Sequence, residues 1–178
     1  MDGHFTGYAS LFGVPDLGRD VVAPGAFSAS LSARGAAGVR MLWQHDPAEP
    51  VGRWLSLVED ARGLRVAGRL NLAVQRAREL DALLREGALD GLSIGFRTVR
   101  AAPERGGLRR LHSLDLWEIS LVTFPLQPGA RIAAKAAPMQ SEPLAQALHA
   151  FARRVAPPRA PPSTRPVAAR LPNRQRFA

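Results

Sequence analysis

The sequence predicts an α+β fold, mainly β, in which an antiparallel β-barrel or sheet is flanked by a few helices. Short apolar stretches alternate with period two along most of residues 1–135, and clusters of Gly, Pro and Asp separate them. One segment has helical spacing instead. A basic, proline-rich C-terminal segment follows, and its composition cannot bury enough apolar surface to offset the loss of chain entropy. We expect that segment to be disordered.

Charge and proline content divide the chain into three expected parts. Its length of 178 residues fits one domain with an appendage. The net charge is +9, but residues 136–178 hold seven Arg against one acid, together with eight of the 15 prolines. We therefore expect a folded domain at 1–135, a linker with an amphipathic helix at 136–155, and a disordered Pro/Arg-rich tail at 156–178.

The composition excludes several classes of function. There is no cysteine, which rules out a disulfide framework, a thiol nucleophile and Cys-ligated zinc. No apolar run approaches the roughly 20 residues that span a bilayer. Nothing implies a metal or organic cofactor, and we expect a soluble, intracellular protein without membrane contact.

The first half of the chain is expected to form strands around one short helix. The expected elements are a strand at 4–13 (HFTGYASLFG), a loop at 13–20, a helix at 24–35 (PGAFSASLSARG) entered through Pro24 and ended at Gly35, a strand at 39–46 (VRMLWQHD), an Asp46-Pro47 turn, and strands at 50–60 and 63–72 that pair around the turn at 59–63.

The second half begins with the clearest helix, at 73–89. Its apolar face holds Ala77, Leu80, Leu83 and Leu84, with Arg, Glu and Asp opposite and Gly87 as the stop. The remaining expected elements are a strand at 91–100 (GLSIGFRTVR), a turn at 104–107, a long strand or bent pair that Pro125 ends, and an amphipathic helix at 141–155.

GLSIG, residues 91–95, matches the G-x-S-x-G nucleophile elbow, but that motif needs a helix after the serine. Here Ile94, Phe96 and Thr98 keep strand periodicity. Ser93 then lies on the face opposite Ile94, between two glycines that leave room for a peptide. Two readings follow, an accessible nucleophile or an ordinary surface serine.

A base and a carboxylate lie elsewhere in the chain. His45 falls at a strand end, and strand alternation in DLWEISLVTF places Trp117, Ile119 and Leu121 on one face and Glu118 on the other. A serine needs a base to take its proton, and an imidazole base needs a carboxylate to orient it. His45, Ser93 and Glu118 offer one of each, on three strands.

Glu118 has an alternative role and two competitors. A lone Glu on a strand commonly pairs with a neighbouring Arg. His112 and Asp115 lie on the same segment, and a register shift or bulge would bring either toward His45 instead.

Five motifs now occur in a family-like order: FTGYASLFG, VVAPGAF, MLWQHDPAEPVGRW, DGLSIGF and LWEISLVTFPLQPGA. With them, the stretch from Phe5 to Arg131 resembles the prohead maturation proteases of tailed phages and gene transfer agents, whose fold is similar to that of the herpesvirus assemblins. The resemblance implies His45 as general base, Ser93 as nucleophile and Glu118 as third triad member, where the herpesvirus enzymes use a second histidine.

The resemblance also implies an activity and partners. The chain would be a serine endopeptidase that cleaves the major capsid protein, a scaffold segment or both, inside an assembling procapsid in the bacterial cytoplasm. It leaves open whether the chain is a homodimer, as the herpesvirus enzymes are, and whether its source is a phage or a gene transfer agent. Oxyanion donors are expected to be backbone N–H groups.

Two other classes of function are weighed against this one. The chain could be a non-catalytic capsid assembly factor with a degenerate protease fold, tethered by the helix at 141–155 and the tail. It could also contact nucleic acid weakly through the Arg-rich tail. Separately, AAKAAPMQSE (133–142) is a flexible small-residue linker of the kind that proteases cut, which predicts self-processing there.

Overall fold

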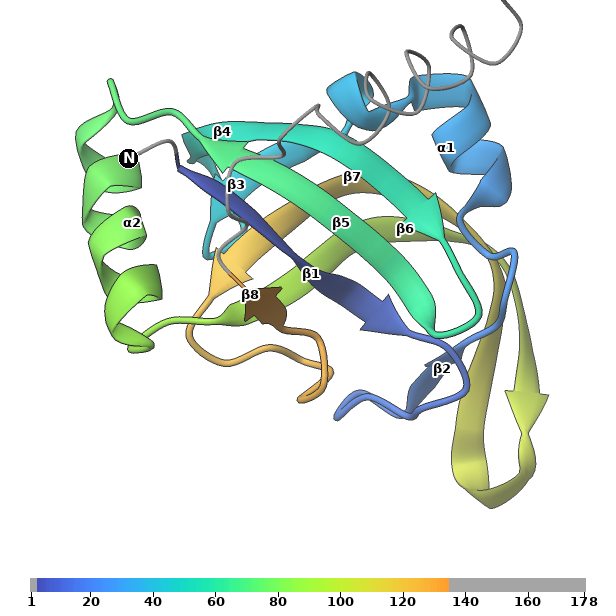
Figure 1. Ribbon diagram of the computed structural model, residues 1–178. Coiled ribbons are helices and arrows are strands. Elements are labelled where there is room, and N and C mark those ends of the chain that lie inside the picture. Colours follow the sequence, from blue (N-terminus) through green and yellow to red (C-terminus); the bar gives the residue numbers. More distant parts are fainter. Residues whose placement is uncertain (1–2, 135–178) are drawn as a thin grey trace, which may run out of the picture. The chain divides into compact units, whose positions relative to one another are not determined.

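The computed structural model describes residues 3–134, which fold into one curled sheet with helices beside it (Figure 1). The strands are β1 His4–Leu11, β2 Asp20–Val22, β3 Arg40–Trp43, β4 Asp46–Glu59, β5 Gly63–Leu70, β6 Gly91–Glu104, β7 Leu108–Val122 and β8 Ile132–Ala134; the helices are α1 Ser28–Arg34, α2 Gln75–Glu86 and two short 3-10 turns, η1 Ala36–Gly38 and η2 Arg105–Gly107. The predicted α+β, mainly β class is confirmed.

Strand β7 organises the sheet, whose order is β2-β7-β3-β4-β5-β1-β8, with β6 paired to β7. Its partner β6 is antiparallel along nearly its whole length, while β2 and β3 pair with it in parallel at different levels. The expected antiparallel pairing of β4 with β5 is present. Near β8, Leu92 N donates to Ala130 O (2.9 Å) and Tyr8 N donates to Arg131 O (3.0 Å), so this segment joins β6 to β1 and tightens the curl.

The core fills the inside of this curl. Phe5 and Trp54 pack edge to face with ring centroids 5.7 Å apart. Burying a side chain of this size stabilises the fold by roughly 1.5–3 kcal/mol. The largest fully buried side chains come from most of the elements: Phe5, Phe27, Met41, Leu64, Leu70, Leu80, Leu92, Leu111, Leu114, Leu116, Ile119 and Leu121.

Both helices end where the glycines predict, but their other details differ. Helix α1 begins at Ser28, because the residues from Pro24 to Phe27 form a turn, and its C-cap is Gly35. Helix α2 ends at Gly87 in a left-handed conformation. Its buried face includes Asp81, which pairs with Arg85, whereas Leu83 is exposed. The expected division of the helix into an apolar and a polar face is therefore wrong at Asp81 and at Leu83.

A β-bulge in β7 overturns one part of the strand reading. Gly95 pairs with Glu118 but Phe96 pairs with Leu116, so Trp117 is the extra residue of the bulge. Leu116 and Ile119 are both fully buried, and the Trp117 side chain is 55% exposed. The prediction that Trp117 shares a face with Ile119 and Leu121 is wrong, because the bulge reverses the alternation between them.

The segment expected as a strand at 39–46 is shorter than predicted. Strand β3 ends at Trp43 and β4 begins at Asp46, so Asp46-Pro47 belongs to β4 rather than to a turn, although Asp46 Oδ1 still accepts a hydrogen bond from Ala48 N (2.8 Å). Strand β2 lies in the stretch expected as a loop and the residues after it.

Several expectations concern the rest of the chain. The linker and helix at 136–155, the tail at 156–178 and most of the proposed self-processing segment lie outside the described residues. Among the residues described, the structure contains no helix long and apolar enough to cross a membrane.

Candidate functional site

His45 lies in a two-residue turn that joins β3 to β4. Trp43 pairs with Asp46, and the two residues between them, Gln44 and His45, have φ angles of 53° and 61°. Two positive φ angles are the pattern of a type I′ hairpin turn, which usually selects Asn-Gly. A left-handed conformation costs a residue other than glycine about 1–2 kcal/mol, so the surrounding contacts must hold this turn in place.

Strand β7 and the residue after it supply those contacts. His45 N donates to Ser120 Oγ (3.1 Å), and Gln44 N donates to Leu121 O (3.0 Å). The Gln44 side-chain amide donates to Thr123 Oγ1 (2.8 Å). The turn is therefore fastened to the end of β7, which fixes the imidazole above that strand.

The imidazole contacts both other predicted site residues. His45 Nε2 lies 2.9 Å from Ser93 Oγ on β6, and His45 Nδ1 lies 2.6 Å from Glu118 Oε1 on β7. The side chains of His45 and Glu118 are 44% and 13% exposed, and Ser93 is 8% exposed. The structure thus brings together His45, Ser93 and Glu118, which we call the candidate triad, with the imidazole on the solvent side.

The carboxylate changes the protonation of the imidazole. The hydrogen bond that His45 Nδ1 donates to Glu118 raises the pKa of His45 above its ordinary value, and the charge of Glu118 acts in the same direction, while partial burial opposes both. Glu118 therefore favours a proton on His45, as a residue that must stabilise an imidazolium should.

Ser120 is part of this network and was missed by the sequence reasoning. It is 0% exposed, and its hydroxyl donates to Glu118 Oε2 (2.6 Å) while it accepts from His45 N. One side chain thus holds the backbone of the His45 turn and the far oxygen of Glu118, leaving Oε1 for the imidazole. Its position two residues after Glu118, on the same strand face, is a signal that could have identified it.

Gly95 has a different role from the one expected. A Cβ at this position would overlap Glu118 Oε1 and lie only 2.7 Å from Glu118 Cδ. Because the Glu118 side chain crosses the open face of Gly95, the room there is taken by the carboxylate and not left for a peptide. At Gly91 the same space is taken by Val122 O and Pro125.

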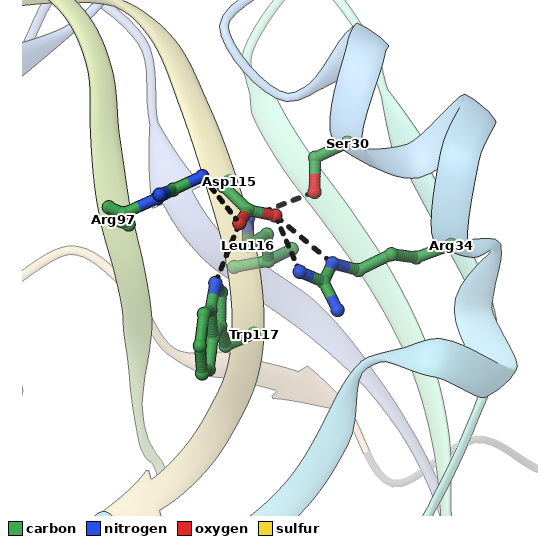
Figure 2. Close-up of polar contacts among 6 residues, drawn as sticks. All are labelled: Ser30, Arg34, Arg97, Asp115, Leu116 and Trp117. Carbon is green, nitrogen blue, oxygen red and sulfur yellow. Dashed lines mark hydrogen bonds and ion pairs between the residues drawn. The ribbon is translucent and has the colours of Figure 1, made fainter.

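The competing acid, Asp115, is occupied elsewhere (Figure 2). Its carboxylate accepts from Arg34 Nε and Nη2 (3.0 and 2.8 Å) and from Trp117 Nε1 (2.8 Å), and Arg97 lies 3.6 Å away. The hydrogen bonds from Arg34, followed by that from Trp117, hold the pKa of Asp115 below its ordinary value.

The competing histidine, His112, lies far along β7. It falls at the third irregularity of the β6–β7 pairing, between Ser113 and Leu111. At about 3.3 Å per residue, it is roughly 20 Å from Glu118 along the strand. Of the three alternatives, Glu118 is the one whose side chain contacts His45. Among the described residues, no group of three or more His, Cys, Asp or Glu side chains is arranged to hold a metal ion.

Comparison with protein families decides the affiliation. The model of the caudovirus prohead serine proteases matches residues 1–143. The chain belongs to this family. The predicted resemblance to prohead maturation proteases of tailed phages is therefore confirmed.

Two relatives extend the comparison. The prohead protease of Enterobacteria phage HK97 is 38% identical over 137 residues, which are 74% of this chain and 60% of that protein. The capsid polyprotein of Pseudomonas phage PAJU2 is 31% identical over 126 residues, 66% of this chain and 18% of that protein. The chain spans less than two thirds of the length of each.

Solved structures share the fold at low identity. The protease of KSHV, crystallised with a hexapeptide phosphonate inhibitor, has a TM-score of 0.55 and 15% identity, and the match covers 85% of this chain and 77% of that one. The capsid assembly protease of bacteriophage T4 has a TM-score of 0.54 and 12% identity, and the match covers 68% of this chain and 82% of that one. The predicted assemblin-like fold is confirmed.

Proposed function

We propose that this chain is a serine endopeptidase that cleaves the major capsid protein, a scaffold segment or both during prohead maturation. The observation that carries the proposal is the hydrogen-bonded chain from Ser93 through His45 to Glu118. The action takes place inside the assembling procapsid, in the bacterial cytoplasm. The source is a phage or a gene transfer agent.

The comparisons support this proposal from another side. The chain belongs to a family described as prohead serine proteases, and one relative is itself called a prohead protease. The second relative is a capsid polyprotein, and the segment similar to this chain is 18% of its length. Both relatives are consistent with a protease that acts on capsid protein during assembly.

The proposed mechanism assigns each side chain one task. His45 Nε2 takes the proton of Ser93 as the hydroxyl oxygen attacks the scissile carbonyl, and Glu118 stabilises the imidazolium that forms. His45 then gives the proton to the leaving amine, and an acyl group stays on Ser93 until water, activated by the same imidazole, releases it. Backbone N–H groups are expected to stabilise the oxyanion.

The direct test is co-expression with the cognate major capsid protein, read by intact mass spectrometry. Wild type should give a capsid protein shortened at a defined site, and Ser93→Ala should leave it full length. Ser56→Ala, a change at an exposed serine of β4, is the matched control and should cleave like wild type.

The alternative, a non-catalytic assembly factor, gives the opposite result. If capsids assemble and mature equally with wild type and Ser93→Ala, and the capsid mass never changes, the serine chemistry is wrong. A homodimer and a weak nucleic-acid contact through the tail at 156–178 stay predictions, which size-exclusion chromatography with light scattering and DNA binding by a variant lacking the tail would test.

A further inference from the structure

Three arginines lie side by side across the exposed face of the sheet: Arg40 on β3, Arg53 on β4 and Arg69 on β5. The register pairs Arg40 with Arg53 and Arg53 with Arg69, so the three side chains share one face at the spacing of about 4.8 Å between strands. All three residues are exposed. Like charges directly opposite one another destabilise a sheet, so the fold gains nothing from this arginine row.

The arginine row begins at the candidate triad. Strand β3 also pairs with β7, and the register places Arg40 opposite Glu118. Successive strands then put Arg40, Arg53 and Arg69 at about 5, 10 and 14 Å from that position. An extended polypeptide that crosses the strands along the row would cover this span in about four residues, at about 3.3 Å each.

A hollow lies at the far end of the arginine row. Its volume is about 700 Å³. The residues that line it are Pro50, Gly52, Arg53, Arg69, Leu70, Asn71, Leu72 and Val74. The guanidinium group of Arg53 beside apolar side chains suits a peptide that carries carboxylates on short apolar stems.

Two of the three arginines of the row, Arg40 and Arg53, have no ion-pair partner among the described residues. Elsewhere Arg34, Arg109 and Arg131 each pair with an aspartate. An anionic partner from outside would therefore find two guanidinium groups ready to bind.

We propose that the arginine row is a docking site for an acidic segment of the substrate polypeptide, within about five residues of the bond that is cut. This inference rests on the proposed peptidase function in one respect, namely that the acidic segment is part of the substrate. Binding itself needs neither Ser93 nor His45. The favoured partner is a peptide rather than nucleic acid, because Trp54, the aromatic residue next to Arg53 in β4, is buried and offers no stacking surface for bases.

The test measures binding in the full-length Ser93→Ala protein, where no cleavage can occur. The probe is a fluorescein-labelled ten-residue peptide that alternates Glu with Ala, compared by anisotropy at low salt with the same peptide carrying Gln for Glu. The row variant is Arg40→Gln/Arg53→Gln. The matched control is Arg100→Gln/Arg105→Gln, which removes the same charge from the β6–β7 hairpin.

We expect the Glu peptide to bind at least about tenfold more tightly than the Gln peptide, and the row variant to lose about tenfold while the control stays within about twofold. Arg40→Lys/Arg53→Lys should keep most of the affinity. Equal losses in the row variant and the control, or equal binding of both peptides, would overturn the proposal, as would tighter, row-dependent binding of a ten-nucleotide oligothymidine.

Failure of this inference and failure of the proposed function are distinguished by two measurements, the anisotropy of the labelled peptide and the mass of the capsid protein. A wrong docking site shows in the anisotropy alone, while capsid cleavage still depends on Ser93. A wrong serine chemistry shows in the capsid mass, while the Glu peptide still binds. With active enzyme, the row variant should raise KM for a substrate with acidic residues and leave kcat unchanged.

Discussion

Strand β7 carries one carboxylate on each side of its bulge, Asp115 and Glu118, and the two have different kinds of partner. Asp115 is surrounded by permanent positive charge and an indole N–H, from Arg34, Arg97 and Trp117 (Figure 2). Glu118 instead contacts one imidazole, which can gain and lose a proton near neutral pH. The difference separates a carboxylate that holds structure from one that can assist a proton transfer.

The bulge at Trp117 places both carboxylates on one face of β7 and puts the Trp117 residue between them. In a regular strand with no bulge, Asp115 and Glu118 would point to opposite faces of β7, because they are three residues apart. With the bulge, both carboxylates lie on the outer side of the sheet, yet Trp117 and its hydrogen bond to Asp115 stand between them. The same strand therefore supplies a salt-bridge cluster and a member of the candidate triad within four residues.

The largest expected effect separates the two carboxylates directly. Glu118→Gln should lower the rate of capsid-protein cleavage by about 10³–10⁴-fold, because the amide cannot stabilise the imidazolium and favours the wrong tautomer. Asp115→Asn should leave the rate within about threefold and lower the free energy of unfolding only slightly, because solvent screens an exposed ion pair.

Single-turnover cleavage and urea unfolding of both variants measure this pair of effects. If Asp115→Asn were the slower enzyme and Glu118→Gln were near wild type, the roles assigned to the two carboxylates would be reversed.

A second prediction tests the room that Gly95 leaves. Gly95→Ala should slow cleavage by roughly 10²-fold, because its Cβ would overlap the Glu118 carboxylate and force it away from His45. The double variant Gly95→Ala/Glu118→Ala should be no slower than Glu118→Ala alone, since the clash is then gone. A full additive loss in that double-mutant cycle would show that Gly95 acts through something other than Glu118.

The sequence predicted most of the strands, the turns at 59–63 and 104–107 and the two glycine helix stops, because these depend on local chemistry. It did not predict β2 or β8, and the turn expected at Asp46-Pro47 is wrong. Gly35 and Gly87 end helices for reasons that do not involve distant residues. The bulge at Trp117 could not be predicted, since it is defined by two residues facing one on β6, and pairing is not encoded in the alternation of β7 itself.

The candidate triad was accessible from the residues for a similar reason. Ser93 and Glu118 are polar residues in apolar strands, where strand alternation already turns them away from the core. The left-handed turn at His45 and the contacts of Ser120 were not accessible, because both arise where β3 and β7 meet in parallel. Long-range pairing decides them.

The third prediction compares two buried serines that hydrogen-bond on the two sides of the bulge, Ser120 in β7 and Ser30 in α1. Ser120→Ala should slow cleavage by about tenfold, because Glu118 Oε2 and His45 N lose their common partner and the imidazole is held less firmly. Ser30 is the matched control: its hydroxyl accepts from Leu116 N (2.9 Å) on the Asp115 side. Ser30→Ala should cost a similar free energy of unfolding, about 1–3 kcal/mol, without slowing cleavage.

Thermal melts and kcat of the two serine variants distinguish positioning from general stability. Equal loss of rate in both would mean that Ser120 acts only by stabilising the fold. A shift in the pH profile of Ser120→Ala alone would support its role in orienting Glu118.

The smallest effect is a shift of the acid limb of the pH profile. His45 must be neutral to act as a base, so kcat/KM should rise with pH through the His45 pKa, which Glu118 raises above the usual value of about 6.5. The limb of wild type should lie above that value, and Glu118→Gln should move it to lower pH, because the hydrogen bond that raises the pKa is lost. Asp115→Asn should leave it in place.

The raised pKa of His45 also makes stability depend on pH, but in the opposite direction: activity rises with pH, and the stabilising contribution of the His45–Glu118 contact falls. A raised His45 pKa means that the folded state binds the proton more tightly than the unfolded state, so its stabilising contribution is complete below the unfolded pKa and is lost as pH rises through the folded one. Unfolding by urea at pH 5.5 and pH 8.5 should therefore show a larger difference in wild type than in Glu118→Gln. The triad would then be most active in the pH range where the His45–Glu118 contact contributes least to the stability of the fold. An acid limb that does not move in Glu118→Gln would contradict the contact between His45 and Glu118 on which both pH predictions rest.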